Sequence, residues 1–271
     1  MVAPTRRGKR RRGVLVTAAL ACLGGLLGLV VGSFLNVVAF RVPLGRSVIR
    51  PGSSCPACGH GIRAGDNLPV LSWLLLGGRC RDCGAAISLR YPLVEAGTAA
   101  AFAGLALLVG ASWVLPGYWW AAGAAIALTL TDLDYRRIPD RILVPGVAGA
   151  AALLALGSFL EGDWWAALRA LAGGAAYFGL LLAVALAARG GFGFGDVKLG
   201  FLLGLVLAHR SWSTLLVGAF AGFALGGLAA VVLLAARRVR RKDAIPFGPA
   251  MVAGAALALA FGDAIARWYL G

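Results

Sequence analysis

Long apolar stretches separated by short polar turns run along almost the whole chain. A helix that crosses a bilayer needs about 20 apolar residues, and eight stretches approach or exceed that length. The predicted spans are residues 14–40, 93–111, 117–134, 142–160, 166–188, 197–209, 213–236 and 247–269. The sixth is short and would need tilt or a half-buried loop. The pattern therefore predicts an all-α polytopic membrane protein with about eight transmembrane helices.

Composition agrees with this pattern. Hydrophobic residues make up 60% of the 271, and the mean hydropathy is +0.85, far above the values of soluble domains. Glycine is abundant, and it recurs at every fourth position in two stretches, at Gly24, Gly28 and Gly32 and at Gly218, Gly222 and Gly226. This spacing lets helix backbones approach closely in lipid, so we interpret these glycines as packing residues.

Charge refines the picture. The chain has 26 lysines and arginines against 11 acidic residues, a formal net charge of +15. The arginines lie in short loops between apolar stretches, which is typical of cytoplasmic loops in membrane proteins. Anionic lipid headgroups are therefore the expected partner, and nucleic-acid binding is not expected.

One large polar segment, residues 41–92, interrupts the apolar pattern. It contains four of the five cysteines and seven arginines. We therefore predict a basic N-terminal tail at 1–13, a first transmembrane helix at 14–40, a cytoplasmic loop domain at 41–92 and a transmembrane core at 93–271.

The distribution of basic residues also predicts topology. With 41–92 in the cytoplasm, the basic loops around Arg136, Arg189 and Arg237 fall on the same side. The tail at 1–13 then lies outside if 14–40 crosses once, so either the later loops outweigh it or 14–40 is not a simple crossing. The tail also imitates a signal peptide, but no convincing cleavage site follows, and the apolar run is too long for one.

The polar loop contains two Cys-x-x-Cys pairs separated by 21 residues, Cys55 with Cys58 and Cys80 with Cys83. This spacing is typical of a four-thiolate zinc site. Four sulfurs leave no open position for water, so the expected role is structural. Gly59 and Gly84 follow the pairs, where the backbone must turn sharply. The alternatives are two disulfides, which a reducing cytoplasmic loop disfavours, or His60 as a competing ligand.

Two aspartates at the ends of apolar stretches, Asp132 and Asp196, are the candidate catalytic residues. A carboxylate at bilayer depth costs about 2.5–3.5 kcal/mol on insertion scales, so such a residue indicates function. The topology places both toward the cytoplasm. Two neighbouring carboxylates share a proton, and such a pair can act as acid and base in peptide hydrolysis. We expect Gly193 and Gly195 to allow unusual backbone angles and close approach of a substrate strand.

Each aspartate also has a structural interpretation. Asp132 could pair at the interface with Arg136 or Arg137, and Asp196 could be a helix N-cap. Other acids fit supporting roles better. Asp134 and Asp140 are expected to be loop residues among arginines, Glu95 a structural or supporting residue at the start of the second span, and Asp263 a residue near the outer interface with Arg267.

Five short motifs, in order, resemble those of the type IV prepilin leader peptidases, a family of membrane aspartyl proteases. They are residues 32–43, the cysteine loop from Cys55 to Glu95, Asp132 with Ile138, Pro139 and Asp140, the Gly-x-Gly-Asp motif ending at Asp196, and residues 245–249. The family motif of Asp, five residues, an aliphatic, Pro and Asp or Asn selects Asp132 over Asp134. The basic tail departs from the family pattern.

The resemblance implies removal of the basic leader from type IV prepilins or pseudopilins at the cytoplasmic face of a bacterial inner membrane, by Asp132 and Asp196. It also implies supporting roles for Gly193, Gly195, Lys198 and Glu95. Many members N-methylate the new amino terminus with S-adenosylmethionine, and the full cysteine loop resembles that of the members with both activities. Two rival functions are a transporter that uses the acids as an ion site and a zinc-loop scaffold without catalysis.

Overall fold

The structure is a computed structural model that describes the backbone of residues 6–187, 193–240 and 245–270. Every regular element within these ranges is helical. Residue contacts divide the chain into two compact units, Met1–Ala111 and Ser112–Gly271. The predicted all-α class is confirmed for the described residues.

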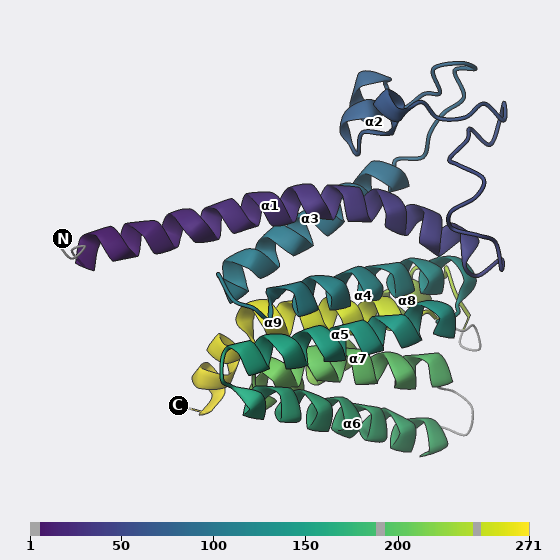
Figure 1. Cartoon of the computed structure of the whole chain (residues 1–271). Helices are drawn as coiled ribbons and strands as arrows, with labels where there is room; N and C mark the ends of the chain where they lie inside the picture. Colours follow the sequence, from purple (N-terminus) through teal and green to yellow (C-terminus); the bar gives the residue numbers. More distant parts are fainter. Residues whose placement is uncertain (1–5, 188–192, 241–244, 271) are drawn as a thin grey trace. The chain divides into compact units, whose positions relative to one another are not determined.

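The first unit is built on two antiparallel helices, α1 (Arg6–Arg41) and α3 (Arg90–Val109), which lie side by side in Figure 1. Small residues allow the contact. A Cβ at Gly28 would lie 2.6 Å from the Cα of Ala99, and one at Gly32 would lie 2.8 Å from the Cα of Glu95. The packing interpretation of these two glycines is therefore confirmed. Helix α1 also extends into the predicted tail, since it begins at Arg6.

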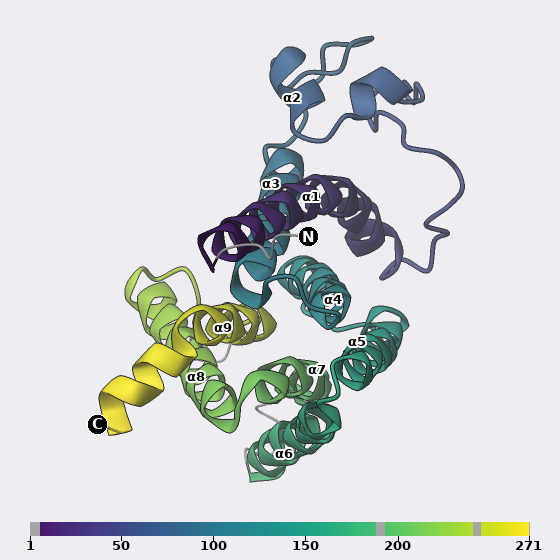
Figure 2. The same ribbon diagram turned by 60° about the vertical axis from the view of Figure 1, so that its left-hand side comes forward.

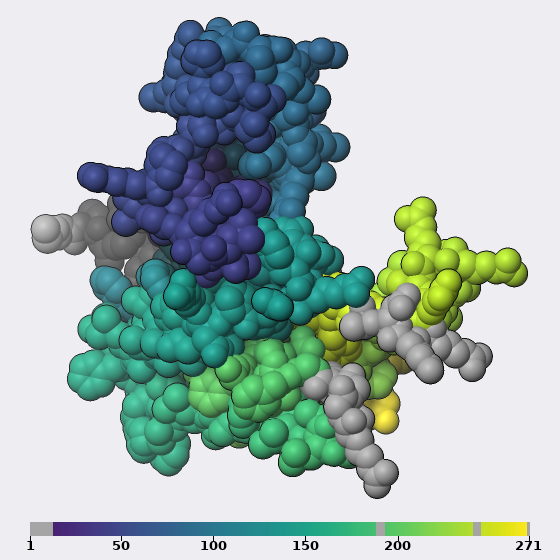
Figure 3. Space-filling model, turned by 90° about the vertical axis from the view of Figure 1, so that its right-hand side faces the viewer, coloured from purple at the N-terminus to yellow at the C-terminus, as the bar shows by residue number. Residues whose placement is uncertain are grey.

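The segment between α1 and α3 forms a separate lobe of the first unit, coloured blue in Figure 3. It contains a short 3-10 helix, η1 (Ala64–Asn67), and one turn and a half of α-helix, α2 (Leu71–Leu75). The rest is turns and loops, in keeping with its many glycines and prolines.

The second unit contains six helices connected by short loops: α4 (Leu115–Tyr135), α5 (Asp140–Leu160), α6 (Trp164–Ala187), α7 (Phe194–Arg210), α8 (Trp212–Ala235) and α9 (Gly248–Leu270). Helix α7 packs against all five of the others, as Figure 2 illustrates. Eleven of its 17 residues are buried, so α7 forms the core of this unit. Glycines again allow close contacts, at Gly204 against α6 and at Gly222 against α9.

Six described helices are long and apolar enough to cross a membrane: α1, α3, α5, α6, α8 and α9. This finding establishes a multi-pass membrane protein. The predicted count of eight is not confirmed, because α4 and α7 are not among the six. Helix α7 has only 17 residues, and the acidic residues Asp132 and Asp196 belong to these two helices.

Candidate active site

The last turn of α4 positions Asp132. Helix α4 ends where Arg136 adopts a left-handed backbone conformation, φ 51°, and its N–H donates to the carbonyl oxygen of Asp132 at 2.9 Å. The Asp132 side chain is buried, and its Oδ2 accepts a hydrogen bond of 3.0 Å from the N–H of Gly248. The first N–H groups of a helix have no partner within it, so the start of α9 offers a donor to a carboxylate. The alternative pairing of this carboxylate with Arg136 or Arg137 is not what the structure contains.

The first turn of α7 positions Asp196. Gly193 occupies the N-cap position and α7 begins at Phe194, so the interpretation of Asp196 as the N-cap is wrong. Its side chain is half-buried. Helices α4 and α7 pack against each other. Gly248 lies against both Asp132 and Leu199 of α7, so the structure places the two predicted carboxylates on neighbouring helices.

The glycines before Asp196 allow a neighbouring segment to pack closely, and they do not adopt unusual backbone angles. Gly193 has an ordinary extended conformation, φ −72° and ψ 132°. A Cβ at Gly195 would lie 3.0 Å from the Cβ of Ile138, which belongs to the loop between α4 and α5. The expectation of strained backbone is corrected in this respect: Gly195 lets the Ile138 loop lie directly against the start of α7.

An ion pair links the same two segments. The Nζ of Lys198 lies 2.8 and 2.9 Å from the two carboxylate oxygens of Asp140. Pro139 caps α5, so Asp140 is the first residue of that helix. We expected Asp140 to lie among arginines, and its partner is Lys198 instead. Asp140 ends one motif singled out in the sequence and Lys198 lies two residues after another, which was the available signal for this contact.

The arrangement can perform acid–base chemistry. Two carboxylates that interact across a partly buried site do not both ionise without cost, so they can hold one shared proton. One carboxylate can then accept a proton from water while the other donates one to a carbonyl oxygen.

The four loop cysteines meet as the sequence predicts. Their sulfur atoms all lie within 4.8 Å of one another, and the Sγ atoms of Cys55 and Cys83 are 3.8 Å apart. A tetrahedral zinc ion with Zn–S bonds of about 2.3 Å needs sulfurs about 3.8 Å apart. All four thiols are free in the structure. The donor set therefore fits a closed zinc site, and neither the disulfide alternative nor His60 as a ligand is adopted.

The two Cys-x-x-Cys turns have the same geometry. Gly59 and Gly84 have φ values of 74° and 71°, and their N–H groups donate to the carbonyls of Cys55 and Cys80 at 2.8 and 2.9 Å. The sharp turns expected at these glycines are confirmed. Backbone N–H groups of Cys58 and Ala57 lower the pKa of Cys55 to about 6. A thiolate is the form that binds zinc, so these N–H groups favour the metal-binding form of Cys55.

Glu95 joins the lobe to α3. Its side chain is buried on the second turn of α3, and Oε2 accepts a hydrogen bond of 2.7 Å from the N–H of Val70. Val70 has a positive φ of 62°. The observed contact is a structural one within the first unit, in line with a supporting role.

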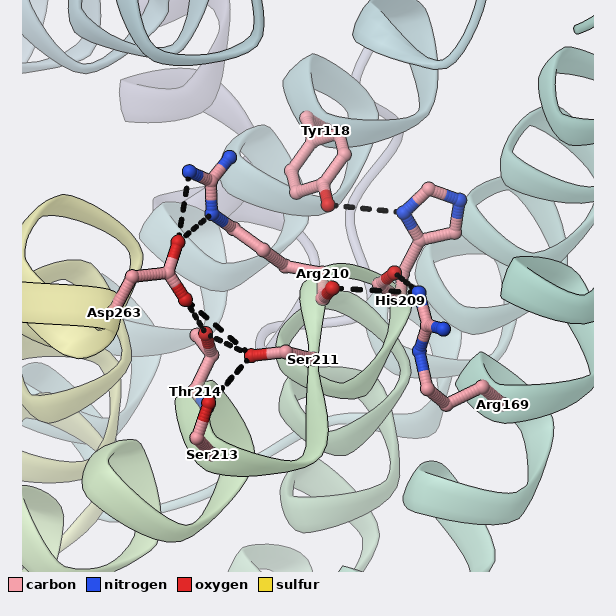
Figure 4. A network of polar contacts seen from close by, with 8 residues as sticks. All are labelled: Tyr118, Arg169, His209, Arg210, Ser211, Ser213, Thr214 and Asp263. Carbon is pink, nitrogen blue, oxygen red and sulfur yellow. Dashed lines mark hydrogen bonds and ion pairs between the residues drawn. The ribbon is translucent and has the colours of Figure 1, made fainter. Parts of the chain in front are cut away.

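Sequence reasoning missed a polar network at the other end of α7 (Figure 4). His209 is buried and hydrogen-bonds Tyr118 at 3.0 Å and Ser158 at 2.9 Å. Arg169 donates to the carbonyls of Ala208 and His209, at 2.7 and 2.6 Å. Ser158 is only 1% exposed, so this Ser–His contact offers no access to a substrate. We interpret the network as a cap that fixes the C-terminal end of α7.

Asp263 belongs to the same end of the unit. It pairs with Arg210 at 3.0 Å, and its Oδ1 lies 3.4 Å from the hydroxyl of Thr214. The expected partner, Arg267, is therefore corrected to Arg210. The pair connects the end of α7 to α9, at the opposite end of α7 from Asp196.

Fold and site together define a class: a multi-pass helical membrane protein with one aspartate in the last turn of α4 and another in the first turn of α7, two helices that pack together. Comparison with known families agrees with this description. Residues 26–109 match the bacterial Peptidase A24 N-terminal domain, and residues 119–235 match the type IV leader peptidase family.

Curated relatives extend over nearly the whole chain. The prepilin leader peptidase/N-methyltransferase of Bacillus subtilis is 36% identical, over 90% of this chain and 96% of the relative. Proteins of the same name from Aeromonas salmonicida and Pseudomonas aeruginosa are 35% and 34% identical, over 90% of this chain and 92% and 91% of the relatives. No solved structure matches. The chain belongs to the type IV leader peptidase family.

Proposed function

We propose that the chain is an aspartyl endopeptidase that removes the short basic leader from type IV prepilins or pseudopilins. The names of the relatives supply the substrate class. The observation that carries the mechanism is the packing of α4 against α7, which puts the buried carboxylate of Asp132 and the first turn of α7, with Asp196, on neighbouring helices.

In the proposed reaction, Asp132 and Asp196 hold one proton between them. The ionised carboxylate takes a proton from a water molecule, whose oxygen attacks the scissile carbonyl carbon. The protonated carboxyl donates to the carbonyl oxygen as its charge develops. A proton then passes to the amide nitrogen and the C–N bond breaks, so no covalent intermediate forms. The hydrogen bond from Gly248 and the Lys198–Asp140 pair hold the two helix ends in place.

The membrane arrangement is part of the proposal. We infer eight crossings, made by the six long apolar helices together with α4 and α7, in a bacterial inner membrane. Positive loops place residues 41–92 and both aspartates toward the cytoplasm. The cysteine cluster would hold a structural zinc ion that stabilises the loop domain, while residues 93–271 supply the peptidase core.

A second activity, N-methylation of the new amino terminus, is favoured by the relatives' names, which include N-methyltransferase. S-adenosylmethionine would be the methyl donor. We assign no residue to this step.

The test uses Asp132→Asn and Asp196→Asn, each purified in full length. The substrate is a synthetic peptide with a basic leader and a hydrophobic stem, supplied with labelled S-adenosylmethionine so that cleavage and methylation are read together. Each variant should lose about 10²–10⁴-fold in cleavage rate, the contribution of acid–base catalysis. Asp134→Asn, two positions away and exposed, is the matched control and should cleave normally.

Near wild-type cleavage by either Asn variant would exclude the pair as the catalyst. Retention of biological function in the double variant would favour a zinc-loop scaffold, and acid-dependent ion flux without cleavage would favour a transporter.

A further inference from the structure

Helix α2 carries an apolar face that nothing in the first unit covers. Leu71, Leu74 and Leu75 are 50%, 61% and 75% exposed, and Leu68 just before the helix is 50% exposed. Positions i, i+3 and i+4 lie on one face of a helix. Exposed leucines this concentrated indicate a contact with another apolar phase.

The opposite side of α2 is tied to the lobe. Ser72 is buried, accepts from the N–H of Leu68 at 3.0 Å and donates to the carbonyl of Gly65 at 3.0 Å. Trp73 donates through Nε1 to the carbonyl of Ile87 at 3.0 Å. Helix α2 is therefore amphipathic, with its polar side toward the lobe and its leucines away from it.

The depth of α2 follows from its contact with α3. The N–H of Val70, which directly precedes α2, donates a hydrogen bond to the carboxylate of Glu95 on the second turn of α3. Glu95 in turn packs against Gly32 of α1. Helix α1 continues nine residues beyond Gly32 to Arg41, which is about 13 Å at 1.5 Å per residue. The start of α2 is thus within one side-chain length of the first turns of the candidate span Arg90–Val109, and Figure 1 shows α2 near the start of α3.

The lobe between α1 and α3 carries a net positive charge, which also favours a position at the membrane surface. Residues 41–92 contain seven arginines and two aspartates, which gives 7 − 2 = +5. Both aspartates are already paired, Asp66 with Arg81 and Asp82 with Arg63. Arg79, four residues after α2, is exposed. Arginines beside a short apolar face are the features of a segment that lies in the interface of an anionic membrane.

We propose that α2 is an interfacial helix that inserts Leu71, Leu74 and Leu75 among the lipid headgroups and upper acyl chains, with the arginines of the lobe on anionic headgroups. The occupant of the apolar face is the bilayer itself. This insertion holds the four-cysteine lobe against the membrane surface beside α3. The inference rests on the multi-pass architecture and not on the catalytic proposal.

The test is photo-cross-linking of the full chain in nanodiscs that contain phosphatidylglycerol. A benzophenone amino acid replaces Leu75 in one variant and Ile49 in the other. Ile49 is the matched control because it is 80% exposed and lies beyond the end of α1. Two residues before it, the carbonyl of Ser47 accepts a hydrogen bond from Arg41, the last residue of α1. The Leu75 probe should cross-link mainly to lipid, at least about tenfold more than the Ile49 probe.

Cross-linking of the Leu75 probe to the second unit or to a second copy of the chain would overturn the proposal, as would equal lipid labelling at both positions. Thiol protection of the four loop cysteines in each variant verifies that the lobe is folded, so absence of lipid cross-links also counts against the proposal. Peptide cleavage is measured separately, and its loss would bear on the proposed function alone.

Discussion

Lys198 donates to both carboxylate oxygens of Asp140, at 2.8 and 2.9 Å, across 58 positions of the sequence. Lys198 directly follows the first turn of α7, which carries Asp196, and Asp140 is the first residue of α5, the helix after α4. Together with the contact of Gly195 against Ile138, it fixes the two aspartate-bearing segments relative to each other.

Breaking this pair should reduce activity more than stability. Asp140→Asn is expected to lower kcat for leader cleavage about tenfold, because small displacements of catalytic groups are costly. The free energy of unfolding should change by at most about 1 kcal/mol, as is usual for an exposed ion pair. The double variant Asp140→Lys with Lys198→Asp should recover most of the activity lost in Asp140→Lys alone. A swap as inactive as the single variant would mean that Lys198 acts on another group.

Gly248→Ala should displace the catalytic carboxylate. A Cβ there would lie 2.9 Å from Oδ2 of Asp132, so the carboxylate must rotate away from its donor. We expect kcat to fall by up to about 10²-fold with an unchanged thermal midpoint. Gly179→Ala is the control, since a Cβ at Gly179 meets nothing within 4 Å. Equal activity of the two variants would count against a role for the Gly248 hydrogen bond.

Zinc removal should release four thiols. Purified protein is expected to contain about one zinc per chain. In detergent a maleimide should modify Cys22, which is exposed, and spare the four loop cysteines until a chelator is added. Metal content by mass spectrometry and thiol counting provide the measurement. Protein without zinc whose four loop thiols are reduced and fully reactive would refute the site.

The cap at the far end of α7 should contribute stability. Arg169→Met removes the donors to the carbonyls of Ala208 and His209, so we expect a loss of about 2 kcal/mol in the free energy of unfolding. Arg169→Lys should recover part of it, since lysine cannot bond both carbonyls with a planar fork. Denaturant titration in detergent measures the loss. Arg267→Met, at an exposed position of α9, is the control, and a similar loss there would contradict the assignment.

Local sequence patterns were sufficient to predict many features of this protein. Apolar stretches predicted the long helices, because each must bury or immerse its own side chains whatever its neighbours are. The Cys-x-x-Cys turns predicted the cluster around Cys55, because each turn supplies two sulfurs through local geometry. Motif spacing selected Asp132 over Asp134. The roles of these residues in catalysis and metal binding stay predictions.

Contacts between segments distant in the sequence could not be predicted from local sequence patterns. The donor to Asp132 is Gly248, 116 positions away, and nothing in either local pattern indicates the other. The rotation of each helix about its axis and its depth against its neighbours decide such contacts, and many side chains must pack at once to set them. For the same reason, the sequence did not predict the hydrogen-bond network of His209 or the ion-pair partner of Asp263.

Local sequence patterns specified an all-helical membrane protein, a four-cysteine loop between its first two long helices, and two candidate catalytic aspartates. Only the tertiary structure decided that α7 is the core of the second unit, that Asp140 meets Lys198, and that the start of α9 holds Asp132. Helix formation and tight turns depend on residues near in sequence, whereas the relative position of helix ends depends on packing among all the helices at once.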